Sequence, residues 1–596
     1  MTDVIQPATG PGSATWFSAV ERAQVIADPS QVAWHEETDL VVVGYGGAGV
    51  AAALQAAGQG LQVIALDRFE GGGSTAMNGG VVYAGGGTAI QKQAGVDDDP
   101  DEMFRYLQEE VQGVVSDATL RRFCEESPAM IDWLMAHGVL FDATIYRKKT
   151  SYPPLKYFLY HPDSSMSAAR AAVAKPAARG HKVWSLHNNK TGTGYGAALF
   201  TPLKEAAQRL GVKQLKNAEV RQLMLDAGGR VIGVKVLLFP ADSEANEKYA
   251  RYQAKAKKYL LALPPSFPGA SLTAGIANYY LRKAQALARV HQVERLIRAR
   301  HGVCLSAGGF IFNRDMICHY APKYQAGMPL GNPGDDGSGI RLGQTAGGAV
   351  SRLQHVSAWR FINPPLGFSK GMMVNADGAR FCDESLYGAA IGYQMCEEQQ
   401  GKGYLILDAK LYREIWRQVF KDQLLPFQRD PAILALLFER RKGASIAALA
   451  KKCGFSGATL EAAIATYNRA AAGLQPDPFA KGAKDMSALT DGPFYAIDVS
   501  VTSKLFPLPV LTLGGLVVDE QSGQVKQPDG TVIDGLYAAG RTAIGVCSHL
   551  YVSGLSAADC IFSGRRAGAH VAATALRQGQ SSAPAETDPA LRTEVA

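Results

Sequence analysis

A glycine turn near the start of the chain constrains the fold more than any other feature. The stretch Asp39–Asp67 reads as an apolar strand, a turn with Gly44, Gly46 and Gly49 in G-x-G-x-x-G spacing, an Ala-rich helix and a second apolar strand. The first glycine permits the tight turn, the second lets the backbone approach a pyrophosphate, and the third lets the helix pack close to the sheet. The pyrophosphate then binds N–H groups at the helix N-terminus. This pattern predicts a Rossmann-type dinucleotide-binding unit; the alternative is a Gly-rich turn in another α/β fold.

Two further features extend this prediction. Asp67 ends the second strand roughly 20 residues beyond the turn, where a carboxylate can accept a hydrogen bond from a ribose hydroxyl. The Gly-rich run Gly71–Gln91 leaves backbone N–H groups unshielded, and its hydroxyls add donors, which suits a cradle for a phosphate and a flat ring, although a surface loop has the same composition. The residues predicted here to bind the cofactor are Gly44, Gly46, Gly47, Ala48, Gly49, Asp67, Arg68, Gly73, Ser74, Thr75, Asn78, Gly79 and Gly80.

Composition narrows the class of protein. A chain of 596 residues exceeds what one hydrophobic core usually supports, so we expect two domains. Eight cysteines without C-x-x-C spacing indicate free thiols in a reducing compartment, and no His/Cys cluster has zinc spacing, so no metal site is predicted. The N-terminus does not resemble a signal peptide, and no apolar run reaches about 18 residues, so we expect a cytoplasmic protein. The formal charge is +7, but no basic stripe carries stacking aromatics, so no nucleic-acid partner is expected.

Residues 241–302 stand out as basic. They hold eleven Lys/Arg against four Asp/Glu, a net charge of +7 with His neutral. Tyr249–Leu263 and Tyr279–Arg300 are predicted as two basic amphipathic helices, separated by the Pro-rich sequence PPSFPG. Such helices can lie on an anionic membrane surface, which predicts a possible peripheral membrane contact. The alternatives are a solvated hairpin that packs only on its own domain, or a contact between copies of the chain.

Several motifs, taken in order, resemble those of the FAD-dependent fumarate reductase and 3-ketosteroid dehydrogenase superfamily. They are GYGGAG, GGGSTAMNGG, SAGGF, DDGSG, GARFCDE, TLGGL, GLYAAGR and GRRAG, and they span roughly residues 37–575. The resemblance implies an α/β fold with a Rossmann-type FAD-binding domain built from both ends of the chain (36–312 and 501–578). An α+β catalytic (capping) domain would be inserted at 313–500, and residues 579–596 would form a disordered tail.

The same resemblance implies non-covalently bound FAD. It adds these cofactor-binding residues: Val220, Ala307, Gly308, Asp336, Gly540, Arg541 and Ser556.

The C-terminal run Gly545–Asp559 favours one branch of this superfamily. Fumarate reductases carry an HGxNRLGGNS-like run whose arginine donates a proton to the dicarboxylate, and here Tyr551 stands at that arginine's place. The sequence Tyr551–Gly554 resembles instead the Y-x-S-G of 3-ketosteroid Δ4-dehydrogenases of the 5α type. In that family a second tyrosine follows a G-x-R-[FY]-x-x-E motif, and GARFCDESLYG supplies Tyr387. His549 and Arg380 keep a carboxylate reductase open as an alternative.

By this resemblance the catalytic residues are Ser553, Tyr551 and Tyr387. Ser553 would take a proton from C4 of a saturated 3-ketosteroid, and Tyr551 would relay that proton. Tyr387 would act as a positioning or proton-relay partner. A hydride would pass from C5 to FAD. The chain has no haem-attachment C-x-x-C-H, so we expect a separate electron acceptor. The other hypotheses are a 3-ketosteroid Δ1-dehydrogenase, a reductase of an unsaturated carboxylate, and a non-catalytic flavin-binding module recruited to membranes.

Overall fold

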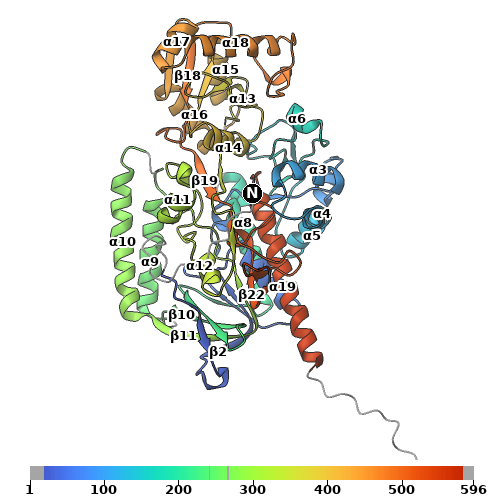
Figure 1. Ribbon diagram of the computed structural model, residues 1–596, viewed down its shortest axis with the longest axis vertical. Helices are drawn as coiled ribbons and strands as arrows, with labels where there is room; N and C mark the ends of the chain where they lie inside the picture. The colour runs from blue at the N-terminus through green and yellow to red at the C-terminus, as the bar shows by residue number, and fades with distance from the viewer. Residues whose placement is uncertain (1–18, 192–193, 241, 265–266, 361, 582–596) are drawn as a thin grey trace, which may run out of the picture.

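The computed structural model describes residues 19–191, 194–240, 242–264, 267–360 and 362–581, and it shows a large body below a smaller upper lobe (Figure 1). The body contains the long sheet and most of both chain ends, whereas the lobe is built from a continuous stretch in the second half of the chain. This arrangement is the predicted one, an α/β cofactor-binding part with an α+β insertion.

The central sheet joins segments that are far apart in the sequence. Its parallel part runs in the order β22 (Val532–Ala538), β11 (Val293–Leu305), β2 (Glu36–Val43), β3 (Val63–Leu66) and β8 (Lys213–Leu215). The first half of β11 also pairs antiparallel with β10 (Val231–Leu238), which pairs with β9 (Glu219–Asp226), and β1 (Gln24–Ile26) completes that edge. The carboxyl ends of the parallel strands therefore meet at one edge of the sheet.

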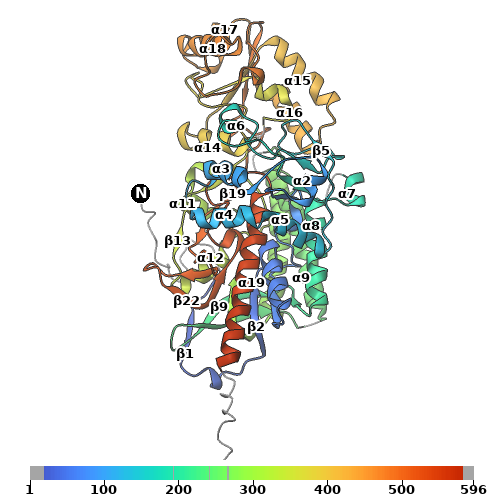
Figure 2. The ribbon, with the colours of Figure 1, turned by 90° about the vertical axis from the view of Figure 1, so that its right-hand side faces the viewer.

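Helix α1 (Gly47–Ala57) connects β2 and β3, which confirms the predicted Rossmann-type unit. It packs closely along α19 (Leu555–Ser581), the last helix, which runs down the body in Figure 2. Two glycines of α19 permit this approach, because a Cβ on Gly564 would lie 2.3 Å from the Ala48 carbonyl oxygen and one on Gly568 would lie 2.4 Å from that of Ala52. The N-terminal and C-terminal parts of the chain thus form one cofactor-binding domain.

A helical hairpin stands between β10 and β11. It consists of α9 (Glu244–Leu260) and α10 (Ala270–His291), and α10 is the outermost helix at the left of Figure 1. The prediction that the second helix reaches Arg300 is wrong beyond His291, since Val293–Arg300 forms the first part of β11. There the backbone pairs with β10 on one side and β2 on the other, and these long-range hydrogen bonds override the local helical pattern.

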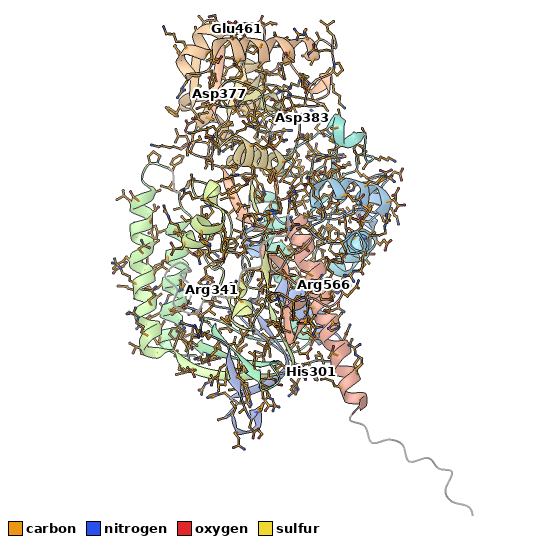
Figure 3. The ribbon with its side chains drawn as sticks, viewed as in Figure 1. His301, Arg341, Asp377, Asp383, Glu461 and Arg566 are labelled. Atoms are coloured by element: carbon orange, nitrogen blue, oxygen red, sulfur yellow. The ribbon has the colours of Figure 1, made fainter. Side chains whose placement is uncertain are left out.

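The upper lobe has its own antiparallel sheet, in the order β15 (Met372–Val374), β16 (Tyr404–Leu407), β18 (Phe494–Asp498) and β17 (Arg440–Gly443). The helices around it are α13 (Leu366–Ser369), α14 (Gly388–Glu398), α15 (Ala409–Lys421), α16 (Pro426–Phe438), α17 (Ile446–Cys453) and α18 (Gly457–Ala471). Figure 3 shows Asp377, Asp383 and Glu461 in this lobe and Arg566 in the body.

Residues 313–360, predicted to belong to the catalytic domain, lie in the body. There β12 (Met328–Pro329) and β14 (Val356–Ala358) pair with β19 (Pro509–Thr512), and α12 (Ser338–Thr345) contacts β9 and β11. The lobe therefore begins near Leu366 rather than at 313.

Two other predictions concern the whole chain. All eight cysteines are free, as predicted. Across the described ranges, no helix combines the length and apolar character needed to cross a bilayer. Helix α19 extends to Ser581, and residues 582–596 of the predicted tail lie outside the described residues.

Candidate active site

A hollow lies at the carboxyl ends of β2, β3 and β11, the edge at which ligands bind in open α/β sheets. The turn between β2 and α1 forms one wall, and the loops after β3, β11 and β22 form the others. The predicted cofactor residues that line it are Gly44, Gly46, Gly47, Ala48, Asp67, Arg68, Gly73, Ser74, Thr75, Val220, Ala307, Gly308, Gly540 and Arg541.

The remaining predicted cofactor residues do not line the hollow: Gly49, Asn78, Gly79, Gly80, Asp336 and Ser556. For Gly49 the structure gives another reason for glycine, because a Cβ there would lie 2.1 Å from the Gly44 carbonyl oxygen and would push α1 off the sheet. Asn78 organises its own loop, in which its side-chain oxygen accepts the Gly80 N–H at 2.8 Å.

Asp335, rather than Asp336, faces the hollow. The Asp336 carboxylate is held by Arg68 at 2.8 Å, whereas the Asp335 carboxylate accepts hydrogen bonds from Ser74 at 2.6 Å and from Arg541 at 2.8 Å. The approach of Asp335 depends on Gly308, where a Cβ would lie 2.0 Å from its carboxylate oxygen and φ is +85°. Two adjacent aspartates in DDGSG cannot be told apart without this tertiary contact.

Arg541 provides a test of whether the hollow fits FAD. Its guanidinium lines the hollow and is buried, and one nitrogen, Nη1, has no hydrogen-bond partner among the described residues. A buried guanidinium with an unused donor suits a phosphate oxygen. The N-terminus of α1 and the unshielded glycine backbone add further N–H donors, so the residues present fit the pyrophosphate and ribose of a dinucleotide.

Asp67 lines the hollow at the predicted ribose position. Its two carboxylate oxygens accept the backbone N–H groups of Tyr45 at 2.9 Å and Phe69 at 2.8 Å. These bonds fix its orientation, and each oxygen retains a lone pair for a further donor.

A second cluster brings the three predicted catalytic residues together. Tyr387 and Tyr551 pack in one buried group, with the indole of Trp359 stacked on Tyr551 at a centroid distance of 4.8 Å. Ser553 lies in the turn directly before α19, and its Oγ is 3.0 Å from the hydroxyl of Tyr160. Tyr387 also hydrogen-bonds to Ser553. Because Cys560 of α19 lines the hollow, the first turns of this helix connect the cluster to the cofactor site.

Sequence reasoning did not name Tyr160 as a catalytic residue, although it predicted that the aromatic stretch 144–161 could line a cleft for a flat apolar ligand or pack in the core. Tyr160 lies on β6 (Leu159–Tyr160) in this stretch, and it is fully buried. Burial raises the pKa of Tyr160, Tyr387 and Tyr551 above the ordinary value for a phenol. All three therefore remain protonated at neutral pH and can donate hydrogen bonds or pass a proton on.

Hydrogen bonds from neighbouring loops hold the cluster in place. The Ser553 N–H donates to the Pro162 carbonyl at 3.3 Å, and the Tyr387 N–H donates to Ser164 Oγ at 2.9 Å. The Ser164 N–H in turn donates to the hydroxyl of Tyr106 at 3.0 Å. The loop at 162–164 thus sets the distance between the C-terminal turn and the upper lobe.

A small cavity lies beside Tyr387 where the lobe meets the body. Its lining comes from both sides: Lys149, Thr150, Ser151 and Asp163 of the body, and Ile362, Asn363, Leu386, Tyr387 and Gly388. The site is therefore built at an interface between lobe and body, a common location for small-molecule sites.

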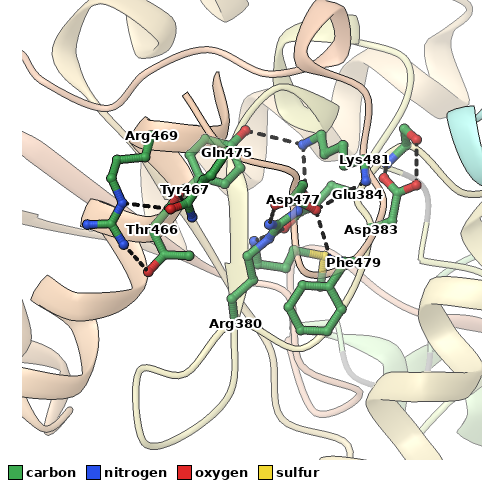
Figure 4. A network of polar contacts seen from close by, with 12 residues as sticks. Arg380, Asp383, Glu384, Thr466, Tyr467, Arg469, Gln475, Asp477, Phe479 and Lys481 are labelled. Atoms are coloured by element: carbon green, nitrogen blue, oxygen red, sulfur yellow. Dashed lines mark hydrogen bonds and ion pairs between the residues drawn. The ribbon is translucent and has the colours of Figure 1, made fainter. Parts of the chain in front are cut away.

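Arg380 and His549, the two residues that favoured the alternative hypothesis of a carboxylate reductase, offer no cation to this cluster. Arg380 is buried within the lobe, where it pairs with Glu384 at 2.8 Å and with Asp477, beside Lys481 (Figure 4). Burial, followed by the neighbouring His355, lowers the pKa of His549 to about 4, so this imidazole is neutral at neutral pH. The cluster is thus apolar and phenolic, which suits a neutral ketone better than a dicarboxylate.

Among the described residues, no three His, Cys, Asp or Glu side chains gather closely enough to hold a metal ion.

Comparisons with known proteins agree with this geometry. The family model described as FAD binding domain matches residues 39–264 and 281–554. A 3-oxo-5-alpha-steroid 4-dehydrogenase of Comamonas testosteroni is 36% identical over 525 residues, which cover 86% of this chain and 94% of the relative. A 3-oxosteroid 1-dehydrogenase of Mycolicibacterium smegmatis is 28% identical, and the match covers 87% of this chain and 94% of the relative.

Among solved structures, the 3-ketosteroid-delta4-(5alpha)-dehydrogenase of Rhodococcus jostii RHA1, in complex with 4-androstene-3,17-dione, matches with a TM-score of 0.76 and 28% identity. The match covers 92% of this chain and 99% of that chain.

Proposed function

Because this chain belongs to the FAD binding domain family, we propose that it is a flavoprotein that oxidises 3-keto-5α-steroids and introduces the C4–C5 double bond. The observation that carries the proposal is the Ser553–Tyr160 hydrogen bond inside a buried group of phenols, joined through α19 to the FAD hollow. The relatives named 3-oxo-5-alpha-steroid 4-dehydrogenase and 3-ketosteroid-delta4-(5alpha)-dehydrogenase support the same assignment.

The proposed chemistry begins with the hydrogens at C4, which are weakly acidic because they lie next to the C3 carbonyl. Ser553 Oγ takes one of them while its own hydroxyl proton moves to the oxygen of Tyr160, 3.0 Å away, and Tyr160 in turn releases its phenolic proton through Tyr551 to solvent. A serine hydroxyl alone is a poor base, so this neighbour is what makes the role possible. Bound FAD would supply the acceptor for the hydride that leaves C5.

The remaining phenols of the cluster stabilise and position the substrate. Removing a proton from C4 places negative charge on the C3 oxygen, and neutral donors aimed at that oxygen lower the barrier. Tyr551 relays the proton, Tyr387 positions Ser553, and Trp359 gives Tyr551 a flat apolar support. Exclusion of water by this buried group strengthens each of these interactions.

The proposed cofactor contacts follow from the hollow. The α1 N-terminus and Arg541 would hold the pyrophosphate, and Asp67 would hold the ribose. Since Gly49, Asn78, Gly79, Gly80, Asp336 and Ser556 do not line the hollow, we propose that they support the site indirectly rather than by contact with FAD.

The experiment that tests the proposal measures product identity. The purified yellow protein is supplied with 5α- or 5β-androstane-3,17-dione and an artificial electron acceptor, and the product is identified. A C4–C5 enone supports the proposal, and the preferred isomer sets the stereochemistry at C5. A C1–C2 alkene would instead assign the protein to the 1-dehydrogenases. If the protein oxidised a reduced dye with fumarate as acceptor, the carboxylate-reductase hypothesis would be favoured instead. Bound flavin without any turnover would favour a non-catalytic flavin-binding module.

The proposal extends to partners and location. A separate electron acceptor reoxidises the flavin, and the protein works in the cytoplasm with a peripheral membrane contact through residues 241–302. Apolar steroids partition into bilayers, so an enzyme at the membrane surface would meet its substrate there.

A further inference from the structure

The helical hairpin of α9 and α10 stands between two strands that are direct neighbours in the sheet. Strands β10 and β11 are direct antiparallel neighbours, with Leu238 opposite Val293, so a short turn would suffice to connect them. The family model that matches the rest of the domain leaves residues 265–280 unmatched. Within this segment, residues 270–280 form the first half of α10.

The inner side of the hairpin is well packed. Ala270, Ala277 and Ala284, spaced by seven residues, are buried on α10, and α9 and α10 contact each other along their length. Near the base of the hairpin, Phe239 and Tyr249 pack with Ala284 in a small core. The hairpin is therefore an ordered element with a defined outer surface.

The outer side of α10 carries large apolar side chains in one stripe. Leu272 is 74% exposed, Ile276 is 41% exposed and Tyr279 is 46% exposed. Their spacing of four and three residues places them on one face of the helix, and Val290, 73% exposed, continues that face. The first three all fall within the segment that the family model leaves unmatched.

Cations surround this stripe. Between Lys248 and Val293 the sequence has eight lysines and arginines and no acidic residue, and the four acidic residues of 241–302 lie at the hairpin base. On α9, Lys248, Arg251, Lys255 and Lys258 follow one another at spacings of three and four, and all are exposed. The field over the outer two-thirds of the hairpin is therefore uniformly positive.

Tyrosines connect the cations to the apolar stripe. Tyr280 lies between Tyr252 and Tyr259 of α9 at centroid distances of 6.1 Å, and it contacts Tyr279 at 5.3 Å. Lys255 lies over Tyr280, and Lys283 lies over Tyr279. Tyrosine and lysine next to exposed leucine is the composition of helices that lie at a membrane–water interface.

From these observations we infer that the outer face of α10 docks on an anionic phospholipid bilayer. Leu272, Ile276 and Tyr279 enter the boundary between headgroups and acyl chains. The exposed lysines of α9, Lys248, Lys255 and Lys258, and Lys283 of α10 pair with lipid phosphates, and the tyrosines lie at headgroup level. The inference rests on the proposed function in one respect, since a steroid substrate dissolved in the bilayer explains why such an enzyme would carry this face.

The test is flotation of the purified holoenzyme with vesicles of phosphatidylcholine alone or with added phosphatidylglycerol. We expect binding to the anionic vesicles that weakens with salt, because exposed charge pairs are screened. The variant Lys255→Gln/Lys258→Gln should lose affinity by about fivefold for each lysine. The variant Leu272→Ser/Ile276→Ser should reduce binding at every salt concentration, because it removes apolar contact rather than charge.

Matched controls lie in the upper lobe. Leu474 is 76% exposed there, and Lys451 and Lys452 are exposed on α17. The variants Leu474→Ser and Lys451→Gln/Lys452→Gln should bind vesicles as the unchanged protein does. Equal binding to neutral and anionic vesicles, equal losses in the lobe controls, or a hairpin-dependent dimer without vesicle binding would each overturn the inference.

The assay separates this inference from the steroid activity. Vesicle binding needs no substrate, and turnover of a dispersed steroid needs no vesicle. Ketosteroid oxidation without vesicle binding would refute the membrane contact alone, whereas vesicle binding without oxidation would refute the proposed function alone.

Discussion

A buried carboxyl group in α3 (Pro100–Val111) makes protein stability depend on pH near neutrality. Glu110 is 2% exposed, and it accepts a hydrogen bond from the hydroxyl of Tyr106 at 2.8 Å. Arg170 approaches it at 3.8 Å. Burial raises the pKa of Glu110 from 4.5 to about 7, against the opposing effect of Arg170. The Glu110 carbonyl also accepts the N–H of Leu550, next to Tyr551 of the proposed catalytic cluster.

The sign of the effect follows from this raised pKa. The folded protein binds a proton at Glu110 that the unfolded chain has released above pH 4.5, so the stabilising contribution is full below that pH. It is lost as pH rises through about 7. Since one pKa unit corresponds to 1.36 kcal/mol, the cost of ionising this group in the folded protein approaches about 3 kcal/mol above pH 8.

The variant Glu110→Gln keeps an acceptor for Tyr106 and removes the titration. We expect it to be more stable than the unchanged protein at pH 8.5 and to lose most of this advantage at pH 5, with a difference in melting temperature of a few degrees. Thermal denaturation between pH 5 and 8.5 measures this. The exposed Glu125 serves as control, and Glu125→Gln should leave the pH dependence unchanged. A constant offset between Glu110→Gln and the unchanged protein at all pH values would refute the argument.

Three further predictions concern the site. Ser553→Ala should lower kcat for ketosteroid oxidation by about 10²–10⁴ while flavin absorbance is retained; near-normal turnover would refute its role as base. Tyr160→Phe removes the hydroxyl that lies 3.0 Å from Ser553, so kcat should fall by at least about tenfold with KM little changed, and a change in KM alone would assign Tyr160 to substrate binding. Gly44→Ala should lower the flavin-to-protein ratio, since φ is +93° and the new Cβ would lie 2.6 Å from Ala307 Cα; full flavin retention would contradict this.

Some parts of the site could be read from local patterns. Strand, glycine turn and helix follow one another within Asp39–Asp67, and each requirement is local: a positive φ, a close backbone approach, an acid at a strand end. Tyr551 and Ser553 stand two residues apart in one turn. Patterns of this kind can be recognised in the sequence because the residues that act together are also neighbours along the chain.

Other parts could not be read in this way. Arg380 looks like a cation for a carboxylate substrate until its partners Glu384 and Asp477 are seen in the lobe. The end of the second hairpin helix was predicted wrongly, because residues 293–300 gain more from pairing with β10 and β2 than from a helical turn. In both cases the deciding interaction joins residues from distant segments.

Two levels of information therefore contribute to this protein. The order of its amino acids specifies a dinucleotide-binding unit, because backbone conformation and short spacings carry that signal, and its resemblance to known flavoproteins adds the flavin and the proposed phenolic turn. Folding in space selects Asp335 over Asp336, brings Tyr160 to Ser553 across 393 residues, and turns the stripe of α10 outward. These choices depend on which surfaces meet and which are left exposed, and such contacts form only when the whole chain has packed.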